Sequence, residues 1–139
     1  MKKYSHLLLI LLVVLSSCSK KEDPAPTQTQ LLSQNTWILG SLTSSDPDIQ
    51  SSGQILLGSE WSFKSDKSFL LYISVNGVNL SFPGTWSISS DEKTITLTTN
   101  MSGTPATTQM TIITLTASAL HLKEIYNGIT SEYTFTKKP

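Results

Sequence analysis

The stretch from residue 60 to residue 82, EWSFKSDKSFLLYISVNGVNLSF, carries the pattern that decides the fold. Apolar and polar residues alternate along it, as in Trp61-Ser62-Phe63, so that every second side chain faces the same way. Asn76-Gly77 interrupts the alternation, and Asn-Gly is the pair that type I′ turns favour between adjacent antiparallel strands. The stretch therefore predicts β-strands joined by tight hairpins.

The same period of two extends on both sides, from residue 31 to the end of the chain. Short runs rich in Thr, Ile and aromatic residues are separated by Gly, Asn, Asp and Pro, which are typical of turns. Asn127-Gly128 predicts a second Asn-Gly hairpin, and the polar segments 64–67 and 90–93 predict two further tight connections. We expect strands at residues 35–43, 60–64, 68–75, 78–82, 85–89, 94–99, 107–116, 119–125 and 129–136.

Alternation also predicts which side chains face the core, because each inward pair brackets a polar residue. The expected inward residues are Trp37, Leu39, Trp61, Phe63, Trp86, Ile88, Ile95, Leu97, Met110, Ile112, Leu120, Leu122, Tyr133 and Phe135. A sheet with one apolar face buries it in a closed barrel or in a two-sheet sandwich, and a meander of short hairpins favours the barrel. The sequence predicts an all-β fold, a small antiparallel up-and-down β-barrel of about eight strands.

Two segments interrupt the strand pattern. Gln30–Ser33 is the only segment in which we expect helical character, as a short turn that could plug one end of the barrel. Residues 44–58 are expected to form a long loop. Residues 31–139 are long enough for one domain with a self-sufficient core.

The N-terminus has the three parts of a secretory signal: Lys2 and Lys3, the apolar run Leu7–Leu15, and small residues before Cys18. Nine apolar residues rise only about 14 Å as a helix, less than half of a bilayer's hydrocarbon layer. The run therefore predicts a leader and not a transmembrane span. We expect residues 1–17 to be the signal peptide.

Cys18 is the only cysteine of the chain. Leu15-Ser16-Ser17-Cys18 resembles the lipobox, in which lipoprotein signal peptidase cleaves before a cysteine that carries diacylglycerol. We expect Cys18 to be the lipidation site, since several acyl chains, palmitate among them, make a durable membrane anchor. A free thiol is the alternative for an unpaired cysteine in an exported protein. Residues 18–30 would then form the lipidated cysteine and a polar, Pro-containing flexible tether.

The expected location is the cell envelope, with the lipid anchor in the outer membrane and the domain on the periplasmic side or at the cell surface. The Lys21-Glu22-Asp23 cluster just after the cysteine resembles a surface-export signal of lipoproteins, and a merely solvated linker is the alternative. The chain has ten Lys, no Arg and ten acidic residues, and without the leader eight Lys face ten acidic residues. This balance offers no basic patch for nucleic acid.

Five segments, in this order, resemble the lipocalin-like domain of bacterial (Bacteroidetes-type) lipoproteins over nearly all of residues 31–139. They are Leu31–Trp37, Glu60–Phe69, Gly84–Ile88, Lys93–Leu97 and Glu132–Thr136. The resemblance implies a small eight-stranded β-barrel behind a lipobox. It also implies that Trp37, near the first strand, closes the floor of the barrel.

The chain offers little catalytic or metal-binding chemistry. His121 is the one histidine after the leader, and alternation turns it away from Leu120 and Leu122, so we expect a solvated surface histidine and not a general base. Asp46-Pro47-Asp48 comes closest to a cation site, but its two carboxylates lack further ligands at useful spacing. We expect no enzymatic activity, no metal and no cofactor.

The aromatic residues are most open to a functional interpretation, because their rings can line a ligand cavity. Under the binding hypothesis the barrel holds a small hydrophobic ligand, and the cavity residues are Trp61, Phe63, Phe69 and Trp86. Under the alternative these rings fill the core, and the barrel is a packed structural or interaction module that contacts an envelope protein or a glycan. The resemblance places ligand binding slightly ahead.

Overall fold

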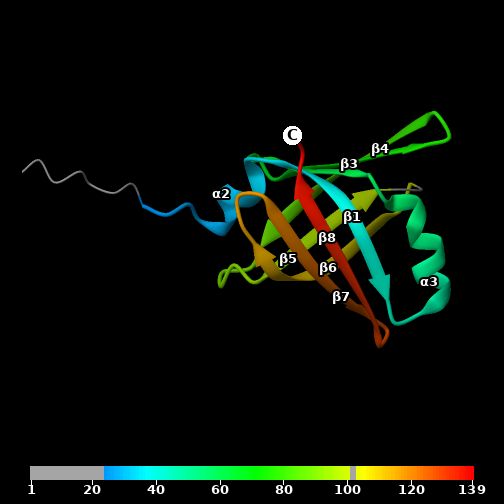
Figure 1. Cartoon of the computed structure of the whole chain (residues 1–139). Coiled ribbons are helices and arrows are strands. Elements are labelled where there is room, and N and C mark those ends of the chain that lie inside the picture. The colour runs from blue at the N-terminus through cyan, green and yellow to red at the C-terminus, as the bar shows by residue number, and fades with distance from the viewer. Residues whose placement is uncertain (1–23, 101–102) are drawn as a thin grey trace, which may run out of the picture.

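A closed barrel of eight antiparallel strands forms the domain, in a computed structural model that describes residues 24–100 and 103–139 (Figure 1). Each strand pairs with the next along the chain, and β8 pairs with β1 to close the sheet. The predicted all-β, up-and-down barrel of about eight strands is confirmed. The predicted signal peptide and Cys18 lie outside the described residues.

The strands are β1 (Thr36–Ser44), β2 (Glu60–Phe63), β3 (Ser68–Val75), β4 (Val78–Ile88), β5 (Thr94–Asn100), β6 (Pro105–Leu115), β7 (Ala119–Tyr126) and β8 (Ile129–Lys137). The helices are α2 (Gln28–Ser33), α3 (Pro47–Ser52) and the 3-10 turn η2 (Gly53–Leu56). None of the described helices is long and apolar enough to cross a membrane.

The predicted turns at the two Asn-Gly pairs have the backbone conformation that a type I′ hairpin requires. Asn76 and Gly77 have φ angles of 50° and 79°, and Asn127 and Gly128 have φ angles of 50° and 80°. Positive φ at both central residues matches the twist of the flanking strands. These pairs therefore fix the register of the β3–β4 and β7–β8 hairpins.

The prediction of separate strands at 78–82 and 85–89 is wrong, because β4 runs through both without a break. Pairing of β4 with β5 begins only at Gly84, so the first half of β4 pairs with β3 alone. Pro83 lies in that half, where one edge of the strand is unpaired and a proline is tolerated. The β3–β4 hairpin consequently extends beyond the barrel wall (Figure 1).

The core contains the side chains that alternation predicts to face inward, with Ile88 and Ile112 only partly buried at its edge. It also contains Leu32, Leu42, Phe69, Leu71 and Ile73. Leu42 breaks the strict alternation after Leu39 because a bulge at Gly40 adds one residue to β1 opposite β8.

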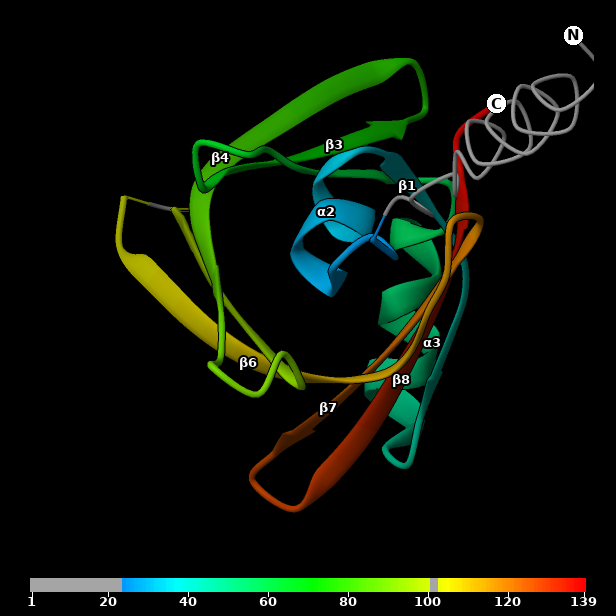
Figure 2. The ribbon, with the colours of Figure 1, turned by 90° about the vertical axis from the view of Figure 1, so that its left-hand side faces the viewer.

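Helix α2 lies across one end of the barrel, as Figure 2 shows along the barrel axis. Thr27 caps the helix in a capping box, in which its side chain accepts from the Gln30 backbone N–H and the Gln30 side chain accepts from the Thr27 N–H. Leu32 is fully buried, and the Trp37 indole N–H donates to its carbonyl oxygen at 3.0 Å. The predicted plug is confirmed, although the helix begins at Gln28, within the expected tether.

The expectation of a single helical segment is wrong, since α3 and η2 occupy the region expected to be a loop. Asp46 caps α3, with its carboxylate accepting from two backbone N–H groups, and Pro47 occupies the first helical position. The Gln50 side chain accepts from the Ser44 N–H at 2.6 Å and donates to the Leu42 carbonyl at 3.0 Å. These two bonds attach the helix to the end of β1.

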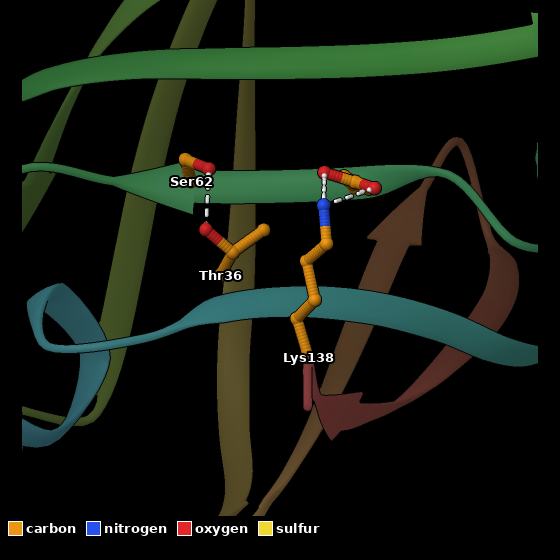
Figure 3. A network of polar contacts seen from close by, with 4 residues as sticks. Thr36, Ser62 and Lys138 are labelled. Carbon is orange, nitrogen blue, oxygen red and sulfur yellow. Dashed lines mark hydrogen bonds and ion pairs between the residues drawn. The ribbon is translucent and has the colours of Figure 1, made fainter.

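Polar contacts reinforce the shortest pairing of the barrel, between β1 and β2. The Thr36 and Ser62 hydroxyls lie 3.0 Å apart across this pair, as Figure 3 shows. Lys138, just after β8, reaches over β1 and its Nζ lies 2.7 Å from a Glu60 carboxylate oxygen on β2 (Figure 3). Three strands are thereby connected where the backbone ladder alone is short.

Candidate functional site

A cavity of about 140 Å³ lies inside the barrel. The end of the barrel opposite α2 holds the β3–β4 and β7–β8 turns together with α3 and η2, and we call this end the mouth (Figure 1). The cavity is lined by Leu56, Trp61, Phe69, Leu71, Leu97, Thr99, Thr108, Met110, Glu124 and Tyr133. Because Leu56 belongs to η2, the cavity lies on the mouth side of the core.

Trp61 and Phe69, two of the four predicted cavity residues, line this cavity. Their rings meet edge to face with centroids 5.7 Å apart, which is a favourable aromatic arrangement. The Trp61 indole N–H donates to the buried Ser59 hydroxyl at 2.9 Å, and its ring also packs edge-on against Phe135. The Trp61 ring is therefore held by contacts on several sides.

Phe63 and Trp86, the other two, do not line the cavity and lie in the packed core. Their rings meet edge to face at 5.7 Å. The Trp86 indole N–H donates to the Lys64 carbonyl at 2.8 Å, and the Lys67 ammonium lies 4.0 Å from the Trp86 ring centroid. These contacts hold Trp86 against the β2–β3 turn, at the barrel end that α2 plugs.

Glu124 and Tyr133 form a polar pair in the cavity wall. The sequence alone did not predict this pair. The Tyr133 hydroxyl donates to the Glu124 carboxylate at 2.9 Å. Burial raises the pKa of the Tyr133 hydroxyl, and the negative charge of Glu124 raises it further, so the hydroxyl remains a donor at neutral pH. Alternation does contain the signal for Glu124, since it follows Leu120 and Leu122 on the inward face of β7.

The cavity has two unlike sides. The side formed by η2, β2 and β3 is apolar, with Leu56, Trp61, Phe69 and Leu71. On the side formed by β5 to β8, each strand changes from an apolar or aromatic inward residue to a polar one a single inward step nearer the mouth. The steps are Leu97 to Thr99, Met110 to Thr108, Leu122 to Glu124 and Tyr133 to Ser131.

His121 lies on the outer wall of the barrel, between the buried inward residues Leu120 and Leu122, as predicted. Its Nε2 lies 3.0 Å from a Glu132 carboxylate oxygen, and its side chain is 29% exposed. A shallow groove of about 200 Å³ beside this pair is lined by Thr43, Ser44, Ser45, Thr130 and Glu132. The histidine thus pairs with Glu132 on the outer surface and does not belong to the cavity wall.

The Asp46-Pro47-Asp48 segment serves the fold. An Asp46 carboxylate oxygen accepts from the backbone N–H groups of Asp48 and Ile49 at 2.9 and 3.1 Å. Within residues 24–100 and 103–139, no three His, Cys, Asp or Glu side chains are grouped so that they could hold a metal ion.

Several solved structures share this barrel. The bovine odorant-binding protein in complex with a selenium-containing odorant is 20% identical with a TM-score of 0.51, and the match covers 86% of this chain and 78% of that one. Its complex with undecanal is 16% identical with a TM-score of 0.51, over 86% and 78% of the two chains. The odorant-binding protein from bovine nasal mucosa is 18% identical with a TM-score of 0.51, over 85% and 78%. At these identities the likeness shows the fold.

Sequence comparison identifies the family. No curated protein is recognisably similar to the chain. The family model of the lipocalin-like domain, in contrast, matches residues 34–122, which is more than half of the chain and extends from β1 into β7. The chain belongs to the lipocalin-like domain family.

Proposed function

We propose that this protein is a cell-envelope lipoprotein whose barrel binds one small, largely hydrophobic molecule in the cavity. The observation that supports the proposal is the cavity of about 140 Å³ with Trp61 and Phe69 in its wall. Apolar cavities of about 150 Å³ accept a molecule the size of benzene. The proposed role is binding and not catalysis.

The sequence supports the anchoring part of the proposal. Under it, Cys18 carries the lipid and holds the barrel at the outer membrane, on the periplasmic side or at the cell surface. Cys18 precedes Gln28, the first residue of α2, by ten residues, which reach at most about 35 Å. Because α2 plugs one barrel end, the anchor would enter at that end and leave the mouth accessible.

A cysteine substitution tests the anchor. Cys18→Ala removes the only acylation site, so we expect the variant to leave the membrane fraction or to be mislocalised, and to incorporate no radiolabelled palmitate. Ser17→Ala, which keeps the cysteine, should behave as the wild type. A Cys18→Ala variant that is still processed and remains in the outer-membrane fraction overturns the anchoring proposal.

A cavity-filling variant tests ligand binding. Thr99 lines the cavity, whereas Thr98 beside it hydrogen-bonds to Thr107 on the outer wall. We expect the full acylated chain in lipid nanodiscs to bind toluene, Thr99→Phe to abolish this binding, and Thr98→Phe to retain it. Ligand-observed NMR against nanodiscs without protein gives the readout. Binding that Thr99→Phe does not reduce, or no binding by the wild type, counts against the proposal.

A packed interaction module is the second candidate, favoured by apolar side chains exposed at the mouth. These are Ile55, Leu57, Val78, Leu80, Ile125 and Tyr126. Single exposed apolar residues are common on protein surfaces, whereas a group of them at one end of the molecule is typical of an interaction site. Under this candidate an envelope partner covers the mouth. Quantitative pull-down should then recover a stoichiometric partner with the wild type and lose it with the double variant Ile125→Ser, Tyr126→Ser. Equal recovery with both proteins would reject it.

A further inference from the structure

We propose that the ligand is a small amphiphile with a protonated amine at one end, which Glu124 binds while an apolar body of about one ring lies against Trp61 and Phe69. This inference rests on the proposed function, because it names the chemical class that the same cavity selects.

Glu124 is the one acidic residue of the cavity wall, and it has acceptor capacity to spare. The Tyr133 hydroxyl occupies one of its oxygens at 2.9 Å. A carboxylate has two oxygens with about four lone-pair sites and donates nothing when ionised, so further donors fit beside the tyrosine. The remaining polar side chains of the wall, Thr99 and Thr108, carry hydroxyls that also accept.

Glu124 has no cationic partner in the described structure. Within residues 24–100 and 103–139 the close contacts between basic and acidic side chains join His121 to Glu132 and Lys138 to Glu60, and neither involves the cavity. A negative group in a largely apolar cavity is stabilised by a positive charge that also donates hydrogen bonds. A ligand ammonium supplies both, and a ligand carboxylate would meet repulsion at the same place.

The two sides of the cavity set the orientation of such a ligand. Glu124 and the two threonines come from the β5 to β8 side, at the inward positions nearer the mouth. Leu56, Trp61, Phe69 and Leu71 form the opposite, apolar side. The ammonium would therefore lie toward the β7 wall and the mouth, where some hydration remains available, and the apolar body would lie on the aromatic side.

The volume limits the size of the body. About 140 Å³ accommodates about one six-membered ring, as a comparable engineered cavity accepts benzene. Benzylamine is therefore a suitable probe, and benzyl alcohol, toluene and benzoate keep the ring while they change the end group.

The test measures the binding of these four probes to the full acylated chain in nanodiscs of zwitterionic lipid, with empty nanodiscs as the blank. We expect benzylamine to bind about tenfold or more tightly than toluene, because a hydrogen bond to a charged group adds to the apolar contact that both probes make. The affinity for benzyl alcohol should lie between those for benzylamine and toluene, and the affinity for benzoate should be the lowest of the four.

The variant Glu124→Gln keeps the shape and removes the charge. We expect it to reduce benzylamine affinity about tenfold relative to toluene affinity, and the toluene binding that it retains also shows that the variant is folded. Glu132→Gln, on the outer wall, is the matched control and should change neither.

Two results would overturn the inference and are distinguishable. If toluene binds in a Thr99-dependent way but benzylamine binds no better, or if Glu124→Gln binds benzylamine as the wild type does, the amine assignment fails and the proposed function stands. If no probe binds the wild type, the proposed function fails, and the amine assignment fails with it.

Discussion

Single inward positions decide the chemistry of the cavity wall. Glu124 occupies the next inward position after Leu122 on β7, and Tyr133 reaches it from β8. Trp61 and Phe69 supply the aromatic surface from β2 and β3. Each residue is positioned by strand alternation, so a change of one side chain alters the cavity without altering the barrel.

The ionisation of Tyr133 predicts a loss of stability in alkali. Burial, and then Glu124, hold its pKa well above the usual 10.0, so above that pH the unfolded chain loses a proton that the folded chain keeps. The contribution of the protonated Tyr133 hydroxyl to the free energy of unfolding is complete below pH 10 and is lost as the pH rises above it. We expect the free energy of unfolding in urea to fall from about pH 9 to about pH 11, and to fall less in Tyr133→Phe.

The matched control is Tyr126→Phe, because Tyr126 is 66% exposed. The free energy of unfolding of Tyr126→Phe should fall between about pH 9 and about pH 11 by as much as that of the wild type. If Tyr133→Phe shows the same decline as this control, the tyrosine is not the cause.

Gly84 lies at a close backbone approach in the barrel wall, beside the Thr98 carbonyl. A Cβ at this position would collide with the Thr98 carbonyl oxygen, whereas a Cβ at Gly40 would make an ordinary contact of 3.6 Å with the Thr134 carbonyl oxygen. We expect Gly84→Ala to lower the free energy of unfolding by about 1–3 kcal/mol, since backbone must move to relieve the overlap. The free energy of unfolding of Gly40→Ala should lie near that of the wild type in the same denaturant titration. Equal losses of stability in Gly84→Ala and Gly40→Ala would contradict the packing described.

Elements at the mouth owe their form to tertiary contacts as much as to local sequence. Helix α3 has only six residues and buries none of them, yet Gln50 connects it to the backbone of Ser44 and Leu42. Helices this short are marginal in isolation. The cap at Asp46 and the bonds of Gln50 together hold α3 beside η2, which places Leu56 in the cavity wall.

The cap of α3 is therefore expected to affect the cavity. Asp46→Ala removes both bonds to the first turn, which costs about 0.5–2 kcal/mol of helix stability. We expect faster amide hydrogen exchange in residues 47–56 and weaker toluene binding. Asp46→Asn preserves a capping oxygen and should resemble the wild type, so equal exchange in all three proteins would show that the cap does not hold this segment.

Much of the fold could be predicted because it rests on local signals. The Asn-Gly pairs specify hairpin turns by their tolerance of positive φ, and alternation places Trp61 and Phe69 on the inward face. Alternation gives the face but not the depth along the barrel, which depends on strand tilt and stagger. For that reason alternation predicts Phe63 and Trp86 in the cavity as well, although they pack in the core away from its wall.

Other features required information that local sequence lacks. The helix α3 has no apolar period, since Ile49 is its one large apolar residue and is exposed. The partners of Gln50 come near it only in the folded chain. The unbroken β4 depends on the point at which pairing with β5 begins. Alternation places Glu124 on the inward face of β7, but only the folded chain brings it to Tyr133, the partner that a charged residue needs there.

The whole molecule is polarised along the barrel axis. One end carries α2, whose buried Leu32 accepts a hydrogen bond from the Trp37 indole through its carbonyl oxygen, and residues 24–27 lead into the helix there (Figure 2). The other end carries the cavity, the polar inward positions of β5 to β8 and the exposed apolar side chains of the mouth. In the proposed envelope lipoprotein, the plugged end is attached to the lipid anchor, and a ligand enters through the mouth.

The measurement that tests the central claim most directly is native mass spectrometry of the acylated protein purified from its own host, compared with its denatured mass. Ligand binding predicts extra mass that is lost on denaturation, of a size that a cavity of about 140 Å³ can hold, and absent from Thr99→Phe. A bare native mass, under conditions in which protein loaded with benzylamine retains its ligand, would contradict the claim and favour the packed interaction module.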